Sequence, residues 1–199
     1  MGKENPVAMF TRDQMDALLY KAIETATPQG KRDRAIFLTA YVYMLRPSEV
    51  GLLRRSDVDA ENGRIHVRRV KRSVGGEFEL RPAVGDAVAV YLDTRDDRLG
   101  ALFLSRNRKP ISRQSLDLLM KRYGEAVGLP EAKRHFRMLR HTGVAHWTEA
   151  SQGNRAAVQA RIGHRHATST HRYGDFTVED EDEVCREAFA SGKFALRPV

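Results

Sequence analysis

The stretch Arg137-Met138-Leu139-Arg140-His141-Thr142 opens a segment that keeps helical spacing from about residue 137 to 149. Two further polar features follow it, Gly163-His164 and, nine residues after His164, a tyrosine at position 173. Arginine binds phosphate oxygens, and a tyrosine oxygen can attack phosphorus. This arrangement therefore indicates phosphate chemistry in the second half of the chain.

A matching arginine lies about ninety residues upstream, in Leu45-Arg46-Pro47-Ser48-Glu49. Proline is unfavourable inside a helix but suits a first turn, so Arg46 is expected at a joint between two helices. The helix after the joint is predicted to start over 48–53, and the helix before it to span about 31–44. The apolar face of the earlier helix is predicted to carry Ile36, Phe37, Ala40, Tyr41 and Met44.

The remaining pattern predicts helices at both ends of the chain and a small sheet between them. Thr11 and Gln14 are typical of the capped start of a helix, which Pro28-Gln29-Gly30 is expected to end. Alternating residues predict strands over 63–68 and 77–80, with Gly75-Gly76 in the turn between them. A short extended piece is expected over 102–104, and further helices over 112–127, 137–149, 155–162, 168–173 and 178–190. We therefore predict a mainly α fold with a small antiparallel β-sheet (α+β), with 1–9 as a tail or linker and 10–199 as one domain.

The composition of the chain indicates what kind of partner it binds and which cellular compartment it fits. Apolar residues make up 41% of the chain, enough to form a core, and 34 Lys and Arg against 26 Asp and Glu give a formal net charge of +8. This balance favours a polyanion, most commonly nucleic acid, over the alternative of a basic protein with no such role. The single cysteine, Cys185, excludes an internal disulfide and fits a reducing cytoplasm. The sequence contains neither an apolar run of membrane-spanning length nor a phosphate-binding glycine loop.

The chemistry of a phosphodiester explains why these residue types belong together. Negative charge builds on the non-bridging oxygens during attack, and Arg46 and Arg140 are candidates to bind these oxygens with paired hydrogen bonds. Tyr173 is the candidate nucleophile, although a phenol with a pKa of about 10 requires deprotonation or a strong positive field. A covalent phosphotyrosine keeps the energy of the broken bond, so a strand could be rejoined without ATP, metal or other cofactor. Considered singly, each residue has an ordinary structural explanation as a surface charge or a buried hydroxyl.

Two histidines and a basic cluster complete the candidate site. Gly163 suits the end of a helix, leaving His164 free to donate a hydrogen bond to the phosphate, while His141 could take the tyrosine proton or brace the site. Lys71, in Arg69-Val70-Lys71-Arg72, is the candidate general acid for the departing 5′ oxygen. Lys71, Arg72 and Arg69 are also expected to contact DNA. The histidines of the second half could instead suggest zinc, but they lack cysteine or regularly spaced acidic partners, so no metal is predicted.

The ordered set resembles the tyrosine recombinase (phage integrase) family over about residues 10–190. The resemblance implies that Arg46 binds the scissile phosphate with Glu49 in support, and that Lys71 is the hairpin lysine of the family. The second arginine motif corresponds to residues 137–142 and contains Arg140. The further motif Ile162-Gly163-His164 and the nucleophile Tyr173 follow in the order of the family.

The chain departs from the family pattern in two respects. The usual histidine three positions before the second arginine is Arg137 here, and His135 lies two residues earlier, out of register. Arginine can bind a phosphate as part of the catalytic set but is a poor proton acceptor, so removal of the Tyr173 proton would fall to His141 or water. Many members also carry an N-terminal core-binding domain. This chain starts where the catalytic domain would begin, which implies a removed domain or an unusually short natural protein.

The resemblance implies a site-specific recombinase that cuts double-stranded DNA through a 3′-phosphotyrosyl link, in the cytoplasm and associated with DNA. The C-terminal helix, with its acidic first turn, is expected to dock on a neighbouring protomer in a tetramer on paired DNA sites, or else to pack on its own domain. A topoisomerase IB-like enzyme, which would relax plasmids lacking a specific site, is one alternative. A non-catalytic DNA-binding protein on the same scaffold is another, and a helix-turn-helix regulator is a weaker third.

Overall fold

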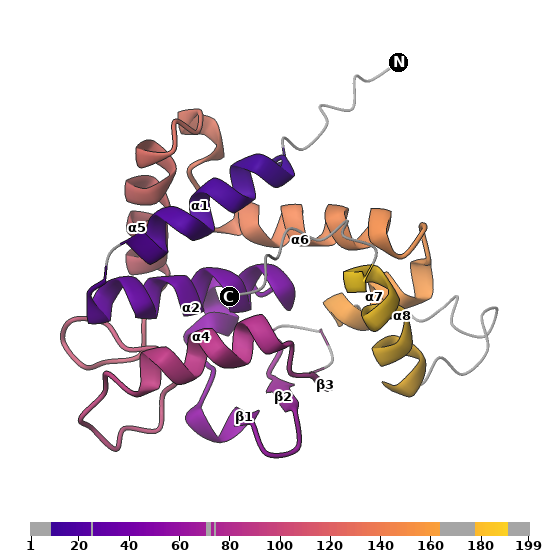
Figure 1. The fold of residues 1–199 in the computed structure, drawn as a ribbon, viewed down its shortest axis with the longest axis horizontal. Coiled ribbons are helices and arrows are strands. Elements are labelled where there is room, and N and C mark those ends of the chain that lie inside the picture. The colour runs from indigo at the N-terminus through magenta and orange to yellow at the C-terminus, as the bar shows by residue number, and fades with distance from the viewer. Residues whose placement is uncertain (1–8, 25, 71–72, 74, 164–177, 191–199) are drawn as a thin grey trace.

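The computed structural model describes residues 9–24, 26–70, 73, 75–163 and 178–190. A small antiparallel sheet lies at one edge of a mainly helical domain, which confirms the predicted α+β class (Figure 1). The helices are α1 (Arg12–Glu24), α2 (Pro28–Val42), α3 (Pro47–Val50), α4 (Pro82–Leu92), α5 (Arg113–Ala126), α6 (Arg137–Ala150), α7 (Arg155–Ile162) and α8 (Val178–Ala190). The strands are β1 (Val58–Asp59), β2 (Arg64–Val67) and β3 (Gly76–Glu79), and single 3₁₀ turns occupy Arg55–Asp57 and Glu131–Lys133.

Local capping chemistry sets the start of the first two helices. The Thr11 backbone N–H donates to Gln14 Oε1 and the Gln14 N–H donates to Thr11 Oγ1, each at 3.1 Å, which confirms the predicted capping box of α1. The first helix ends before Pro28, but the helix predicted from about residue 31 begins earlier, at Pro28 itself. Thr27 accepts from the Gly30 N–H at 3.1 Å and Pro28 occupies the first turn of α2, where its missing N–H costs nothing.

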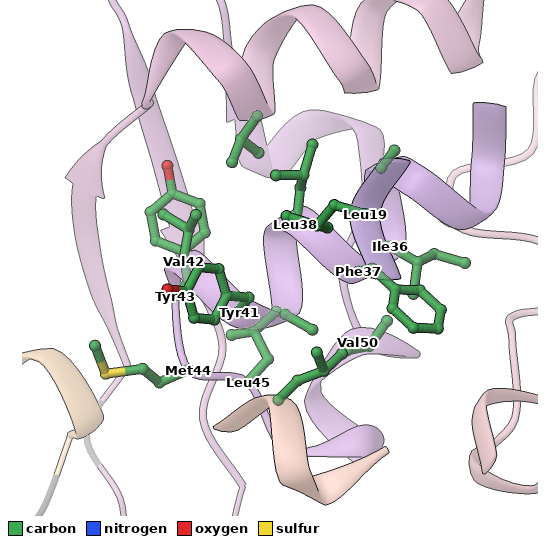
Figure 2. Close-up of a cluster of buried hydrophobic side chains, with 14 of the residues drawn as sticks. Leu19, Ile36, Phe37, Leu38, Tyr41, Val42, Tyr43, Met44, Leu45 and Val50 are labelled. Atoms are coloured by element: carbon green, nitrogen blue, oxygen red, sulfur yellow. The ribbon is translucent and has the colours of Figure 1, made fainter. Parts of the chain in front are cut away.

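Helix α2 is the centre of the core. All residues from 35 to 45 are buried, so the second half of the helix is enclosed all round by α1, α4 and α6 and not only along one apolar face. Figure 2 shows the cluster that this segment forms with Leu19 and Val50. Phe37 meets the rings of Tyr123 and Phe136 edge-on, with centroids 5.6 and 5.5 Å apart. Truncating such a ring to alanine costs about 3–5 kcal/mol, so Phe37 contributes substantially to the stability of the core.

The sheet has the order β1-β2-β3, with both pairs antiparallel. Ile65 lies opposite Phe78 and Val67 opposite Gly76, so Gly76 belongs to the strand and not to the turn that was predicted. The expected extended piece over 102–104 is not part of the sheet; it forms an isolated bridge between Leu104 and Pro110 and backbone hydrogen bonds with Leu53 and Ile111. Strand β1 and helix α4 were not predicted from the sequence.

The second half follows the predicted helices closely. Helix α7 ends at Gly163 in the left-handed conformation, with φ 67°, as its position after Ile162 predicted. Helix α8 packs on its own chain, because Cys185 and Ala188 are buried and Asp182 accepts a hydrogen bond from Arg64 at 2.5 Å. The helix predicted over 168–173 lies outside the described residues. None of the described helices combines the length and apolar character that crossing a bilayer requires.

Candidate active site

Arg46 and Arg140 meet at one cleft, although ninety-three positions separate them in sequence. Arg46 precedes the first turn of α3, and Arg140 lies in the first turn of α6. The cleft has a volume of about 840 Å³. Its lining residues are Met9, Arg46, Pro47, Ser48, Arg113, Asp117, His135, Arg137, Met138, Arg140, His141, Val144, Ala145 and Ile162. Arg46 and Arg140, the two arginines predicted to clamp the phosphate, therefore share one concave surface.

The buried carboxylate of Glu49 forms ion pairs with both arginines. Arg46 donates to it twice, from its backbone N–H at 2.8 Å and from Nη1 at 2.6 Å, and the ion pair with Arg140 Nη1 spans 3.8 Å. Burial alone would raise the pKa of Glu49, but the Arg46 N–H bond and the charge of Arg69 outweigh it, so the pKa is lowered. Glu49 is therefore ionised at neutral pH and orients the guanidiniums around it.

Arg140 is the more enclosed of the two clamp residues. Its side chain is 9% exposed against 24% for Arg46, and its Nη1 donates to the Met44 carbonyl at 2.5 Å. Burial, and then the charges of Arg46 and Arg69, lower the pKa of Arg140 to about 10, so it remains charged at neutral pH. Three arginines around one carboxylate leave a net positive charge. The cleft thus suits an anion with several acceptor oxygens.

Met44 supplies an acceptor that the sequence did not indicate. Its φ of 50° is left-handed, an unfavourable conformation for a methionine, and its side chain is fully buried. The conformation presents its carbonyl to Arg140 and, at 3.3 Å, to Arg69 Nη1. A methionine carries no sequence signal for positive φ, so only the structure could identify this residue.

The first turns of α6 bring more basic groups into the cleft. Arg137 is exposed there, and His141 follows one helical turn later, half-buried. Burial first, and then the charges of Arg137 and Arg140, lower the pKa of His141. The imidazole is therefore mainly neutral near pH 7 and able to accept a proton. His135, out of register in sequence, also lines the cleft.

Arg69 differs from the sequence expectation that it contacts DNA. Its side chain is fully buried and pairs with Glu49 Oε2 at 3.0 Å. It also donates to the carbonyls of Tyr43, at 2.9 Å, and Arg161, at 2.5 Å. A guanidinium enclosed in this way cannot contact a nucleic acid, so the expectation was wrong for the Arg69 side chain. Its hydrogen bonds are instead made within the protein.

Comparison with known proteins agrees with this geometry. Residues 8–179 match the phage integrase family. This chain belongs to that family. Among its relatives in the phage integrase family, Tyrosine recombinase XerA of Thermococcus onnurineus is 35% identical over 162 residues, which is 80% of this chain and 56% of the relative. The Putative integrase/recombinase y4gC of Sinorhizobium fredii is 32% identical over 182 residues, 87% of this chain and 91% of the relative.

The solved structures of the phage integrase fold show the same architecture. XerH site-specific recombinase bound to difH substrate matches with a TM-score of 0.67 at 17% identity, over 86% of this chain and 51% of that chain. At this identity the likeness concerns the fold alone. The chain spans a little over half the length of several curated relatives that it matches.

Four residues of the predicted phage integrase site lie outside the described residues: Lys71, Arg72, His164 and Tyr173. Described neighbours of these positions contact the two clamp arginines. The hydroxyl of Ser73, in the β2–β3 connection, accepts a hydrogen bond from Arg46 Nη1 at 3.2 Å. Ile162 lines the cleft, and its carbonyl lies 3.5 Å from Arg140 Nη2. The described residues hold no group of three or more His, Cys, Asp or Glu placed for a metal ion.

Proposed function

We propose that this chain is the catalytic part of a site-specific DNA recombinase that cuts and rejoins strands through a covalent 3′-phosphotyrosyl link. The observation that carries the proposal is the convergence of Arg46 and Arg140 on one cleft over the shared carboxylate of Glu49. Two guanidiniums fixed in this way match the non-bridging oxygens of a phosphodiester, on which charge builds during attack. Family membership and a net charge of +8 support DNA as the partner.

The proposed reaction conserves the energy of the phosphodiester bond. The Tyr173 oxygen attacks phosphorus, the bond from phosphorus to the 5′ oxygen breaks, and Lys71 gives that oxygen a proton. A 5′-hydroxyl, from the same strand or a partner strand, then attacks the phosphotyrosine and releases the tyrosine. His164 would donate a further hydrogen bond to the phosphate. The closeness of Ser73 and Ile162 to the clamp supports these assignments, because Lys71 and His164 are each two residues away in sequence.

We assign removal of the Tyr173 proton to His141. Arg137 stands where the family has a histidine, and its fixed charge makes it a phosphate ligand and not a base. His141 lies one turn away in the same cleft, and its lowered pKa keeps the ring neutral and able to accept a proton. Arg137 thus supports the reaction twice, by binding the phosphate and by keeping His141 unprotonated.

We further propose that the chain acts as a tetramer on paired DNA sites, in the cytoplasm. In this structure α8 buries one face on its own chain and leaves Glu183, Arg186 and Glu187 exposed. These exposed side chains are available to a neighbouring protomer. Sedimentation of the chain on paired sites tests this, with Arg186→Ala as the variant. A complex of one protomer per site that never pairs the two sites would refute the assembly.

The nucleophile is tested with Tyr173→Phe on a duplex nicked near the cleavage point, which traps the covalent product. The wild type should form the adduct and Tyr173→Phe should bind the DNA without forming it, while Tyr20→Phe, on α1, should behave as the wild type. An adduct in Tyr173→Phe would disprove the assignment. Relaxation of a plasmid that lacks a specific site would instead favour a topoisomerase, and binding with no adduct on any substrate would favour a non-catalytic DNA-binding protein.

A further inference from the structure

The buried side chain of Arg69 makes four hydrogen bonds next to the clamp residues Arg46 and Arg140. Its guanidinium donates to Glu49 and to the main-chain carbonyls of Tyr43, Met44 and Arg161, at distances from 2.5 to 3.3 Å. The side chain is 0% exposed. These four acceptors come from three places in the chain: the end of α2, helix α3 and the last turn of α7. One side chain thus ties together the elements that meet at the site.

The last turn of α7 is anchored a second time, by the side chain of Arg161. This guanidinium is fully buried, 5.1 Å from the centroid of the Tyr43 ring, 5.2 Å from Phe78 and 5.0 Å from Trp147. It also donates to the Val42 carbonyl at 3.3 Å. Contacts between a cation and aromatic rings are stronger when desolvated. The Arg161 carbonyl that Arg69 binds is therefore fixed in position from both sides.

Arg69 helps to position Glu49 and Arg140 although it does not itself line the cleft. Glu49 Oε2 accepts from Arg69 Nη1 at 3.0 Å, whereas Arg140 Nη1 lies 3.8 Å from the same oxygen. Of these two guanidiniums, Arg69 is therefore the one hydrogen-bonded to Glu49 Oε2, beside the Arg46 backbone N–H at 2.8 Å. Arg140 instead lines the cleft and donates to the Met44 and Ile162 carbonyls.

We propose that Arg69 is a positioning residue of the active site, which fixes the end of α7 relative to Arg46 and Arg140. The inference rests on the proposed DNA cleavage, because its consequence is a rate. Residues 164 to 177 follow directly after α7, so the position of the α7 end decides where that segment starts. Loss of Arg69 should slow the cleavage of bound DNA and leave DNA affinity unchanged, since the side chain is fully buried and is not among the residues that line the cleft.

The test compares Arg69→Met with Arg68→Met, a matched control on the neighbouring residue. Arg68 also pairs with a buried carboxylate, Asp57, at 2.6 Å, but it is 38% exposed and bonds to neither α2 nor α7. At saturating protein and at a temperature where each variant is fully folded, Arg69→Met should cleave a nicked duplex about 100-fold more slowly. Arg68→Met should cleave at the wild-type rate. Arg69→Lys keeps the charge but not the planar fork, so it should restore only part of the rate and serves if Arg69→Met does not fold.

Hydrogen exchange separates this inference from the proposed function. Amides at the end of α7 should exchange faster in Arg69→Met and Arg69→Lys than in the wild type or Arg68→Met. An active wild type with full cleavage by Arg69→Met and Arg69→Lys would overturn the positioning role and leave the proposed function standing. If the wild type forms no adduct at all, the proposed function fails. Unchanged hydrogen exchange at the end of α7 in the Arg69 variants would overturn the inference that Arg69 fixes this helix end.

Discussion

Gly143 in α6 marks the closest approach of that helix to the end of α2, and Gly143→Ala probes how accurately the clamp is placed. A Cβ at this position would lie 2.5 Å from the Tyr41 carbonyl oxygen and 3.1 Å from Met44 Cγ. An ordinary contact between carbon and oxygen is about 3.3 Å or longer, so the two helices must separate by about 0.8 Å. Because Arg140 lies three residues before Gly143, the shift stretches its bond to the Met44 carbonyl.

Two opposing terms set the stability of Gly143→Ala. Alanine favours a helix interior over glycine by about 1 kcal/mol, whereas overpacking a close contact costs about 1–3 kcal/mol. Gly85→Ala in α4 isolates the first term, since its Cβ would meet only the Leu80 side chain, at 3.4 Å. The free energy of unfolding of Gly143→Ala should therefore fall about 1–3 kcal/mol below that of Gly85→Ala, as measured by urea denaturation.

The rate of DNA cleavage provides a second comparison of Gly143→Ala with Gly85→Ala. Misplacement by about 1 Å costs on the order of 100-fold in rate, so Gly143→Ala should cleave a nicked duplex roughly 10- to 100-fold more slowly, while Gly85→Ala keeps the wild-type rate. The reasoning is refuted if Gly143→Ala is as stable as Gly85→Ala and cleaves as fast. That result would mean that the α2–α6 contact yields without disturbing Arg140.

Three further predictions test the site and its support. Glu49 has a lowered pKa in the folded state, so its contribution to stability is present above the usual value of 4.5 and is lost as pH falls below it; acid denaturation of Glu49→Gln should lack this component, although the variant is less stable at pH 7. Arg137→Ala removes a charge that lowers the pKa of His141, so NMR titration should show that pKa moving back toward 6.5; no movement would argue against the assigned coupling. Arg161→Ala empties a fully buried, ring-lined space and should lower the free energy of unfolding by about 3 kcal/mol or more, and a change below about 1 kcal/mol in urea denaturation would contradict that role.

Local signals in the sequence predicted much of the fold. Thr11 with Gln14, and Gly163 after Ile162, identify helix ends because each acts within a few residues. The start of α2 was predicted three residues too late, because Pro28 was assigned to the break between the helices and not to the first turn of the next one. Helix α4 escaped prediction, since its run of alternating alanine and valine favours neither period clearly.

For the site too, features set by nearby residues could be predicted from the sequence, whereas features set by distant residues could not. The spacing of Arg46 and Glu49, and of Arg137 with Arg140, indicated groups that do line or support one cleft. The burial of Arg69 could not be read from its neighbours, because its partners come from α2, α3 and α7. The left-handed Met44 is likewise imposed by tertiary contacts and not by its own preference.

Peptide mapping of a trapped protein–DNA adduct tests the central claim most directly. The wild-type chain is incubated with a nicked duplex that carries its cleavage site, digested, and the phosphonucleotide-bearing peptide is sequenced by mass spectrometry. The account predicts a 3′-phosphate linked to Tyr173, and the loss of this adduct in Arg46→Ala and Arg140→Ala. A nucleotide linked to any other residue, or an undiminished adduct without the two arginines, would contradict it.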